Sequence, residues 1–258
     1  MIRLAVFGAC GRVGTRIIEL AGTNPEFQIT GAIEAEGHSG VGKKVIDGKI
    51  VVGSNPAALR GLADVFMDFT APDATLNHLK TAEGWENAAF VIGTTGISSG
   101  AMAEIEKYSR KMPMVVSSNM SVGMNIMFDV VRSIARKTPD SDIEIIEAHH
   151  NQKKDAPSGT ALALAKEMLD ELERPENDIV YGRKGNVGPR TRKEIGIHAV
   201  RAGDIVGDHT VIFAATGERL EITHRASSRD NFAAGALRAA QWIYKKKPGL
   251  YSMKDVLA

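Results

Sequence analysis

The segment from Glu147 to Ala161, EAHHNQKKDAPSGTA, gathers side chains that could bind an anion and move a proton. Two histidines, His149 and His150, are adjacent, and Lys153 follows shortly after them. An imidazole exchanges a proton near neutral pH, and a lysine supplies a point charge for a carboxylate. The segment therefore predicts a site for a negatively charged ligand that accepts a proton.

The end of this segment adds a second set of donors. Ser158, Gly159 and Thr160 stand where a helix is expected to begin, so free N–H groups, hydroxyls and the helix dipole meet there. This arrangement suits a carboxylate. Ser158 could instead serve only as an N-cap, and the two roles are compatible.

A metal site is the alternative for the same segment, because Glu147, His149, His150 and Asp155 carry ligand atoms. However, adjacent side chains of a strand point to opposite faces, and the nearby lysine opposes a cation. We expect no metal.

A glycine-rich loop lies near the start of the sequence. GACGRVG places Gly8, Gly11 and Gly14 between an apolar strand and a helix, a variant of the dinucleotide fingerprint. Glycines let the backbone approach a pyrophosphate, and the helix start attracts its charge. A tight turn without a ligand is the structural alternative. Glu34, 20 residues after Gly14, lies where an acid can bind a ribose diol.

The residue after Glu34 bears on the choice of cofactor. NADP binding usually uses a basic residue there, and this chain has Ala35. His38, Lys43 and Lys44 could replace it, or the lysines could be a solvated loop face. We expect NADH to be favoured, with NADPH as the second cofactor.

The elements that position these residues alternate along the first half of the chain. Apolar strands are predicted at 2–8, 27–34, 63–70, 88–96 and 113–119, with helices at 11–21, 72–83 and 98–111 and a loop at 35–48. This rhythm predicts a doubly wound parallel sheet. The segments 93–96 and 117–123 follow strands, at the edge where such sheets bind ligands.

The rhythm changes after about residue 121. A helix is expected at 121–136, with Ile126, Val130, Val131 and Ile134 on one face, then a strand at 142–149 and a helix from Ser158. Residues 194–226 predict a mixed or antiparallel sheet with turns at 202–203, 207–208 and 216–217, and a helix closes the chain.

Composition narrows the class of protein. The 258 residues have a net charge of +1 and one cysteine, Cys10, which we expect to be a small filler in the loop. There is no basic excess for nucleic acid, no membrane-length apolar run and no pair of cysteines for a disulfide. A cytoplasmic protein is expected.

The segment EAHHNQKKDAPSGTA resembles the signature of the dihydrodipicolinate reductase family, E-x-H-H-x-x-K-x-D-A-P-S-G-T-A, at every fixed position. The resemblance extends along nearly the whole chain, through GACGRVG, DFTAPDATLNHL, VIGTTG, SSNMSVGMN, RAGDIVGDH and GERLEITHRASSR. It implies NAD(P)H-dependent reduction of 4-hydroxy-tetrahydrodipicolinate in diaminopimelate and lysine biosynthesis.

The resemblance also implies roles for residues. His149 is implied as the proton donor, Lys153 as the second catalytic group, and His150, Ser158, Gly159 and Thr160 as substrate binders. The implied cofactor contacts are Gly8, Ala9, Cys10, Gly11, Arg12, Val13, Glu34, Gly93, Thr94, Thr95, Ser117, Ser118, Asn119 and Met120.

The implied fold is a Rossmann domain, 1–120 with 229–258, completed by the C-terminal helix. It is joined to a substrate-binding and tetramerisation domain, 121–228, with an open mixed sheet; the implied assembly is a homotetramer.

Two departures stand out: Ala35 stands where some members have an arginine that grips the NADPH phosphate, and Met120 stands where members often have Phe. Two rival functions stay open. One is another nicotinamide-dependent reductase of a small dicarboxylate. The other is a non-catalytic NAD(H)-sensing module, which would have no use for the His-His-Lys and Ser-Gly-Thr residues.

Overall fold

The computed structural model describes residues 1–258. The chain divides into two compact units: unit 1 comprises Met1–Val122 and Arg229–Ala258, and unit 2 comprises Gly123–Ser228. The sequence-based boundaries were 1–120 with 229–258, and 121–228. The roles expected for the two units, dinucleotide binding and substrate binding with tetramerisation, stay predictions.

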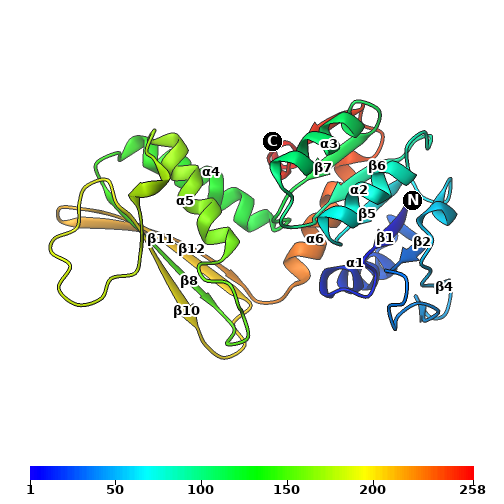
Figure 1. Cartoon of the computed structure of the whole chain (residues 1–258), viewed down its shortest axis with the longest axis horizontal. Helices are drawn as coiled ribbons and strands as arrows, with labels where there is room; N and C mark the ends of the chain where they lie inside the picture. The colour runs from blue at the N-terminus through cyan, green and yellow to red at the C-terminus, as the bar shows by residue number, and fades with distance from the viewer. The chain divides into compact units, whose positions relative to one another are not determined.

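Unit 1 is built on a sheet of six parallel strands in the order β13-β7-β6-β5-β1-β2 (Figure 1). The strands are β1 (Ile2–Phe7), β2 (Phe27–Ile33), β5 (Val65–Asp68), β6 (Ala89–Ile92), β7 (Pro113–Val116) and β13 (Gly249–Tyr251). The segment expected to be a loop contains one strand of a short antiparallel pair, β3 (Lys44–Val45) and β4 (Ile50–Val51).

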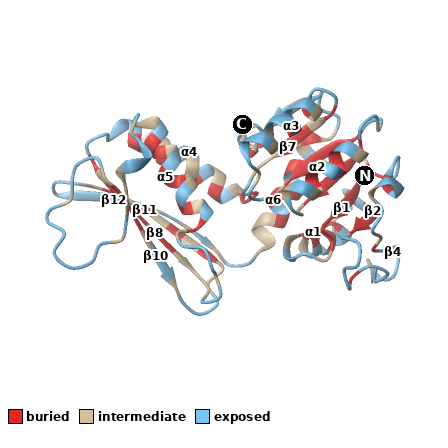
Figure 2. Cartoon of the chain, in the orientation of Figure 1, coloured by how far each residue is buried: buried red, intermediate tan, exposed pale blue.

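The sheet has an apolar core on each face, as its continuous apolar strands require. Leu4 and Val6 of β1 belong to one core, while Ala5 and Phe7 belong to the other. The first core includes residues of α1 (Arg12–Thr23), α6 (Asp230–Ile243) and α7 (Met253–Leu257). The second includes residues of α2 (Pro72–Thr81), α3 (Ser99–Ser109) and the 3-10 helix η1 (Pro56–Leu59). Figure 2 shows the buried residues concentrated in these strands.

Helix α6 brings the C-terminal part of the chain back to complete unit 1. Its buried face is built mainly of small residues, which let the helix approach the rest of the unit closely. At Gly235, a Cβ atom would lie 1.8 Å from the backbone oxygen of Met120. The first core is therefore shared between residues more than a hundred positions apart in the sequence.

Unit 2 contains a five-stranded mixed sheet in the order β12-β11-β8-β10-β9. Strands β8, β10 and β9 are parallel, and β11 is antiparallel to β8 and β12. The strands are β8 (Asp142–His149), β9 (Ile179–Tyr181), β10 (Ile195–Arg201), β11 (Gly207–Ala215) and β12 (Glu218–Ala226). Its helices are α4 (Val122–Lys137), α5 (Gly159–Glu171) and the 3-10 helix η2 (Glu176–Asp178).

The predicted fold class is confirmed: a Rossmann-like parallel sheet with helices, completed by α6, and a separate mixed sheet. Two details of the prediction are wrong. On α4, Ile126 and Val130 are 52% and 37% exposed, because the buried stripe runs instead through Met124, Met127, Val131 and Ala135. The turn expected at 207–208 is the beginning of β11, where Gly207 pairs with Ala226.

Candidate active site

The glycine loop of unit 1 joins β1 to α1 with its backbone closely packed. Gly8 has a positive φ of 74°, which other residues rarely adopt. A Cβ atom on Gly14 would lie 2.1 Å from the Gly8 oxygen, so only glycine lets the helix start this close to the loop. The loop therefore brings backbone N–H groups and the α1 dipole together, which suits a pyrophosphate.

Glu34 follows β2 and lies against this loop. Its Oε2 accepts a hydrogen bond from the backbone N of Cys10 at 3.0 Å, and its Oε1 accepts one from the backbone N of Ala35 at 3.0 Å. The carboxylate is thereby held beside the loop, and each oxygen retains a lone pair for a diol.

A cavity of about 500 Å³ opens beside this carboxylate. Its lining comprises Gly8, Cys10, Gly11, Ile33, Glu34, Ala35, Glu36, His38, Ser54, Pro56, Phe69, Thr70, Ala71, Ala74, Asn77 and His78. Of the three basic residues expected near Ala35, His38 lines this cavity, whereas Lys43 and Lys44 line a different one of about 540 Å³.

The other expected cofactor residues of the loop and of the strand ends differ in exposure. Gly11, Arg12, Thr95 and Ser118 are exposed, Val13, Gly93, Ser117 and Asn119 are partly buried, and Ala9, Thr94 and Met120 are buried. Thr94 is bonded to Thr75 through the two Oγ1 atoms, 2.8 Å apart. Met120 packs in the first core of unit 1. Their contacts with a cofactor stay predictions.

A buried polar network that the sequence did not single out lies between β5 and α2. Asp68 is fully buried, and its Oδ2 is 2.8 Å from Nδ1 of His78. Its Oδ1 accepts from the hydroxyl and the backbone N of Thr70. The His78 ring stacks on Phe7, with 4.0 Å between centroids, and also lines the cavity next to Glu34. Asp68 and His78 both lie in the motif DFTAPDATLNHL, but the spacing of these residues in the sequence did not predict a role for either of them.

Cys10, Glu34 and His38 have ligand atoms within 4.8 Å of one another, a spacing that a metal ion can bridge. The His38 and Glu34 atoms already accept hydrogen bonds, however. The backbone N of Gly40 donates to Nδ1 of His38 at 3.0 Å, and Glu34 accepts two backbone bonds. Burial raises the pKa of the Cys10 thiol, and the Glu34 charge adds to this effect. The cluster therefore favours the protonated thiol.

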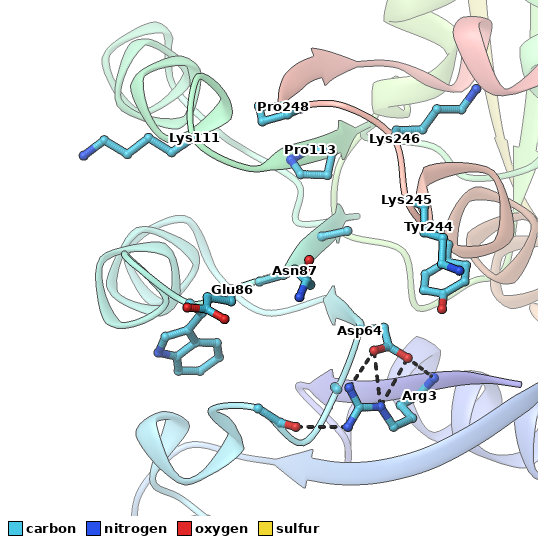
Figure 3. A pocket seen from close by; sticks show the side chains of 15 residues that line it. Arg3, Asp64, Glu86, Asn87, Lys111, Pro113, Tyr244, Lys245, Lys246 and Pro248 are labelled. Atoms are coloured by element: carbon cyan, nitrogen blue, oxygen red, sulfur yellow. Dashed lines mark hydrogen bonds and ion pairs between the residues drawn. The ribbon is translucent and has the colours of Figure 1, made fainter.

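A cavity of about 750 Å³ lies at the opposite, amino-terminal edge of the same sheet (Figure 3). Its cationic side chains have partners: Arg3 bonds to Asp64, Lys111 to Glu83, and Lys246 lies over the ring of Trp242. In Figure 3, Lys111 and Lys246 extend away from each other. These side chains do not converge on one ligand.

In unit 2, the end of β8 is organised around Glu147, whose side chain is fully buried. The carboxylate accepts hydrogen bonds from His149 Nδ1 at 2.6 Å, from the backbone N of Ser158 at 3.0 Å and from two nitrogens of Arg201 at 2.7 and 2.8 Å. Burial alone would raise the pKa of Glu147, but the bonds from Arg201, His149 and Ser158 lower it. Glu147 is therefore an anion that joins β8, α5 and β10.

His149 is partly buried beside this carboxylate. Burial lowers the pKa of His149, Glu147 opposes this effect, and the charges of Lys153 and Arg201 add to it. On its other side lies His209 of β11, whose ring centroid is 5.3 Å away in an edge-to-face arrangement. Burial lowers the pKa of His209 to about 4, so this second ring is neutral near pH 7.

The structure brings most of the expected residues of this segment to one end of the unit 2 sheet. Ser158 caps α5 by accepting from the backbone N of Ala161, and its Oγ is 3.1 Å from Nε2 of His209. Gly159 and Thr160 form the first turn of α5, with Gly159 exposed. Lys153 is bonded to both carboxylate oxygens of Asp155 at 2.9 Å. His150 follows β8 and is partly buried.

The sequence-based prediction missed three residues of this site: Glu147 as a hydrogen-bond acceptor, Arg201 and His209. The latter two lie in the motif RAGDIVGDH, more than 45 positions after Glu147. The sequence did contain one indication of their role: Arg201 and His209 are a charged and a titratable residue on either side of a turn between two predicted strands.

The comparisons with known proteins agree along the whole chain. A family model described as dihydrodipicolinate reductase, N-terminus, matches residues 2–120, and one described as dihydrodipicolinate reductase, C-terminus, matches residues 123–257. The 4-hydroxy-tetrahydrodipicolinate reductase of Syntrophus aciditrophicus is 46% identical, over 100% of this chain and 98% of its own. That of Syntrophobacter fumaroxidans is 46% identical, over 100% and 99%.

Among solved structures, a dipicolinate-bound dihydrodipicolinate reductase from Paenisporosarcina sp. TG-14 is similar to the chain in fold. It has a TM-score of 0.77 at 24% identity, and covers 98% of this chain and 97% of its own. No helix of the chain has the length and apolar character that crossing a membrane requires.

Proposed function

Because this chain belongs to the dihydrodipicolinate reductase family, we propose that it reduces 4-hydroxy-tetrahydrodipicolinate to tetrahydrodipicolinate with NAD(P)H, a step toward diaminopimelate and lysine. The observation that carries this function is the constellation at the end of β8, where His149 and the α5 N-terminus are bonded to a buried carboxylate and Lys153 lies in the loop that joins them. A planar dicarboxylate needs cationic and N–H partners and a proton donor, and these residues supply all three.

The glycine loop, Glu34 and the adjacent cavity fit a nicotinamide dinucleotide, because the loop leaves space for a pyrophosphate and the carboxylate has lone pairs for a ribose diol. When bound, the cofactor supplies a hydride to one ring carbon. Ala9 to Val13 would hold the pyrophosphate. The segments 93–95 and 117–120 are the candidates for the nicotinamide side.

The residues of unit 2 would supply the remaining parts of the reaction. The substrate would first lose water, its hydroxyl leaving together with a hydrogen of the neighbouring ring carbon, which creates a ring double bond. One carbon of that double bond would accept the hydride, and His149 would donate a proton from Nε2 to the other. Lys153 would release Asp155 and pair with a substrate carboxylate. His150, Ser158, Gly159 and Thr160 would bind the carboxylates through side-chain and backbone donors at the α5 N-terminus.

We infer that NADH is preferred over NADPH. Two observations support this preference: Ala35 offers no cation for a 2′-phosphate, and Lys43 and Lys44 line a cavity other than the one beside Glu34. The Glu34 carboxylate would also repel a phosphate on the ribose that it binds. Steady-state kinetics with both cofactors test this preference, and a higher kcat/KM with NADPH would contradict it.

We also infer a homotetramer built through unit 2. The face of its sheet opposite the helices carries Ile146 and Val200, which are 40% and 43% exposed in the isolated chain. Exposed apolar side chains on a sheet face are typical of an interface between subunits. Light scattering would give the mass directly, and a monomer at micromolar concentration would contradict the inference.

The function is tested by adding the condensation product of aspartate semialdehyde and pyruvate and following NADH absorbance. His149→Ala should lower kcat by roughly 10²–10⁴ and leave NADH affinity nearly unchanged. His198→Ala is a matched control, because His198 is hydrogen-bonded to Glu144 away from this site. Equal turnover by the His149 variant would remove its assigned role.

Lys153→Ala should weaken binding of pyridine-2,6-dicarboxylate by about tenfold or more, since a carboxylate loses its counter-charge. An NAD(H)-sensing module would have no reason to bind this compound. Turnover of a different dicarboxylate in preference to the condensation product would favour the rival reductase.

A further inference from the structure

Glu147 controls both the orientation and the charge of the imidazole that the proposed function uses. A carboxylate can only accept hydrogen bonds, so Nδ1 of His149 carries a hydrogen and donates it at 2.6 Å. In the neutral ring, Nε2 is then an unprotonated acceptor. To donate from Nε2, His149 must first take up a second proton.

The space beside Nε2 depends on a glycine. It lies beside Gly207, the first residue of β11, where a Cβ atom would be 3.1 Å from Nε2. That distance is shorter than ordinary van der Waals contact, so a larger residue at position 207 would crowd the imidazole. His149 is bonded to Glu147 through Nδ1, and Nε2 makes no hydrogen bond within the chain.

The charges that face His149 do not favour a second proton in the free protein. From β8 there is the anion Glu147, but Arg201 at the end of β10 binds both of its oxygens and neutralises it. From the following loop comes Lys153, itself paired with Asp155. From β11 comes His209, which is buried and bonded to Ser158 of α5. The site therefore lacks an unpaired negative charge next to the imidazole.

A dicarboxylate would supply that missing charge. We propose that Glu147 and Arg201 act as a pair of opposing positioning residues: Glu147 orients the ring and favours its charged form, and Arg201 offsets the charge of Glu147, so that His149 stays neutral in the free enzyme and takes up its proton only when the dianionic substrate binds. This proposal rests on the proposed function. Binding of the substrate would then cause the protonation of His149. In the free protein, the neutral imidazole would not repel the nearby cations Lys153 and Arg201.

Titration calorimetry with pyridine-2,6-dicarboxylate tests the proposal directly. The observed heat is measured at pH 7.5 in two buffers with different ionisation enthalpies, and the difference gives the number of protons taken up. We expect about one proton or a large fraction of one per site, and a dissociation constant that rises by up to about tenfold per pH unit above neutrality. Equal heats in the two buffers with tight binding would overturn the proposal.

Variants assign the proton to one residue. His149→Asn should still bind the dicarboxylate but without proton uptake, whereas His150→Asn should retain the uptake. Glu144→Gln is the matched control on the same strand, since Glu144 is a half-buried carboxylate bound by Arg183 and His198 outside this site. Uptake that persists in His149→Asn would overturn the assignment.

The two positioning residues should shift His149 in opposite directions, which a merely structural role would not do. In nitrogen-15 NMR titrations of the free protein, Glu147→Gln should lower the pKa of His149, and Arg201→Met should raise it. The first variant should also move the alkaline limb of the pH–rate profile, where a general acid loses its proton, to lower pH. Equal pKa values of His149 in the two folded variants would overturn the proposed roles.

The outcomes also separate this proposal from the function on which it rests. Turnover of the condensation product without proton uptake on dicarboxylate binding would overturn only the proposal made for Glu147 and Arg201. Absence of both turnover and dicarboxylate binding would overturn the proposed function as well.

Discussion

Replacing Gly14 by alanine would place a methyl group where the glycine loop has no room. The new Cβ atom would lie 2.1 Å from the oxygen of Gly8 and 2.9 Å from its carbonyl carbon. Both are backbone atoms, so no side-chain rotation relieves the contact. Either α1 must move away from β1, or the loop that joins them must change its path.

The size of the effect follows from two opposing terms. Alanine is favoured over glycine within a helix by about 1 kcal/mol, while overpacking of a closely packed site costs about 1–3 kcal/mol or more. Because the contact is with backbone, we expect the upper part of that range and a net loss of about 1–2 kcal/mol. NADH affinity should fall by at least about tenfold, since the displaced loop is the one proposed to hold its pyrophosphate.

Tryptophan fluorescence in urea measures this effect for unit 1 alone, because both tryptophans of the chain, Trp85 and Trp242, belong to that unit. Gly100→Ala is a matched control in α3, where the nearest atom beyond its chain neighbours is 3.9 Å from the added Cβ. It should stabilise unit 1 by roughly 0.5–1 kcal/mol. A Gly14 variant with unchanged urea midpoint and NADH affinity would refute the reasoning.

Three further predictions concern the cofactor, the buried network and pH. Ala35→Arg should shift the ratio of NADPH to NADH affinity by about tenfold or more toward NADPH, because an arginine binds a phosphate with two charge-assisted hydrogen bonds; dissociation constants for both cofactors check this. Asp68→Ala should destabilise unit 1 by about 1–3 kcal/mol by leaving His78 and its neighbours without their buried acceptor, as measured by tryptophan fluorescence in urea. Lowering the pH from about 6.5 to 4 should destabilise unit 2. The unfolded imidazole of His209 gains a proton near pH 6.5, whereas burial lowers its pKa to about 4 in the folded state, so the unfolded state binds more protons in this window. Amide hydrogen exchange of β8 should show this loss, and His209→Gln should reduce it.

The parallel sheet was predictable because its strands are short apolar runs between glycine-containing turns. In β1, five of six residues are buried, and such a run is typical of a sheet covered on both faces. The very short strands β9 and β13, three residues each, carry too little pattern to be recognised. They form because the edges of β10 and β7 offer backbone hydrogen-bond partners to β9 and β13, respectively.

The site was predictable where its residues are close in sequence. His149, Lys153 and Ser158 lie within ten positions and fall at one end of one sheet. The bonds from Arg201 and His209 depend on the pairing of β8 with β10 and β11, which no local spacing encodes. The exposure of Ile126 likewise depends on which face of α4 meets the sheet.

The return of α6 to unit 1 has a consequence for biosynthesis of the chain. While a ribosome has delivered only residues 1–122, the face of the parallel sheet destined for α6 is only partly covered by α1, since eight of the 25 buried residues of the first core lie beyond residue 228. Unit 2, whose residues are continuous, emerges complete before that cover arrives. Unit 2 should thus acquire its native structure first during translation, and unit 1 should mature last.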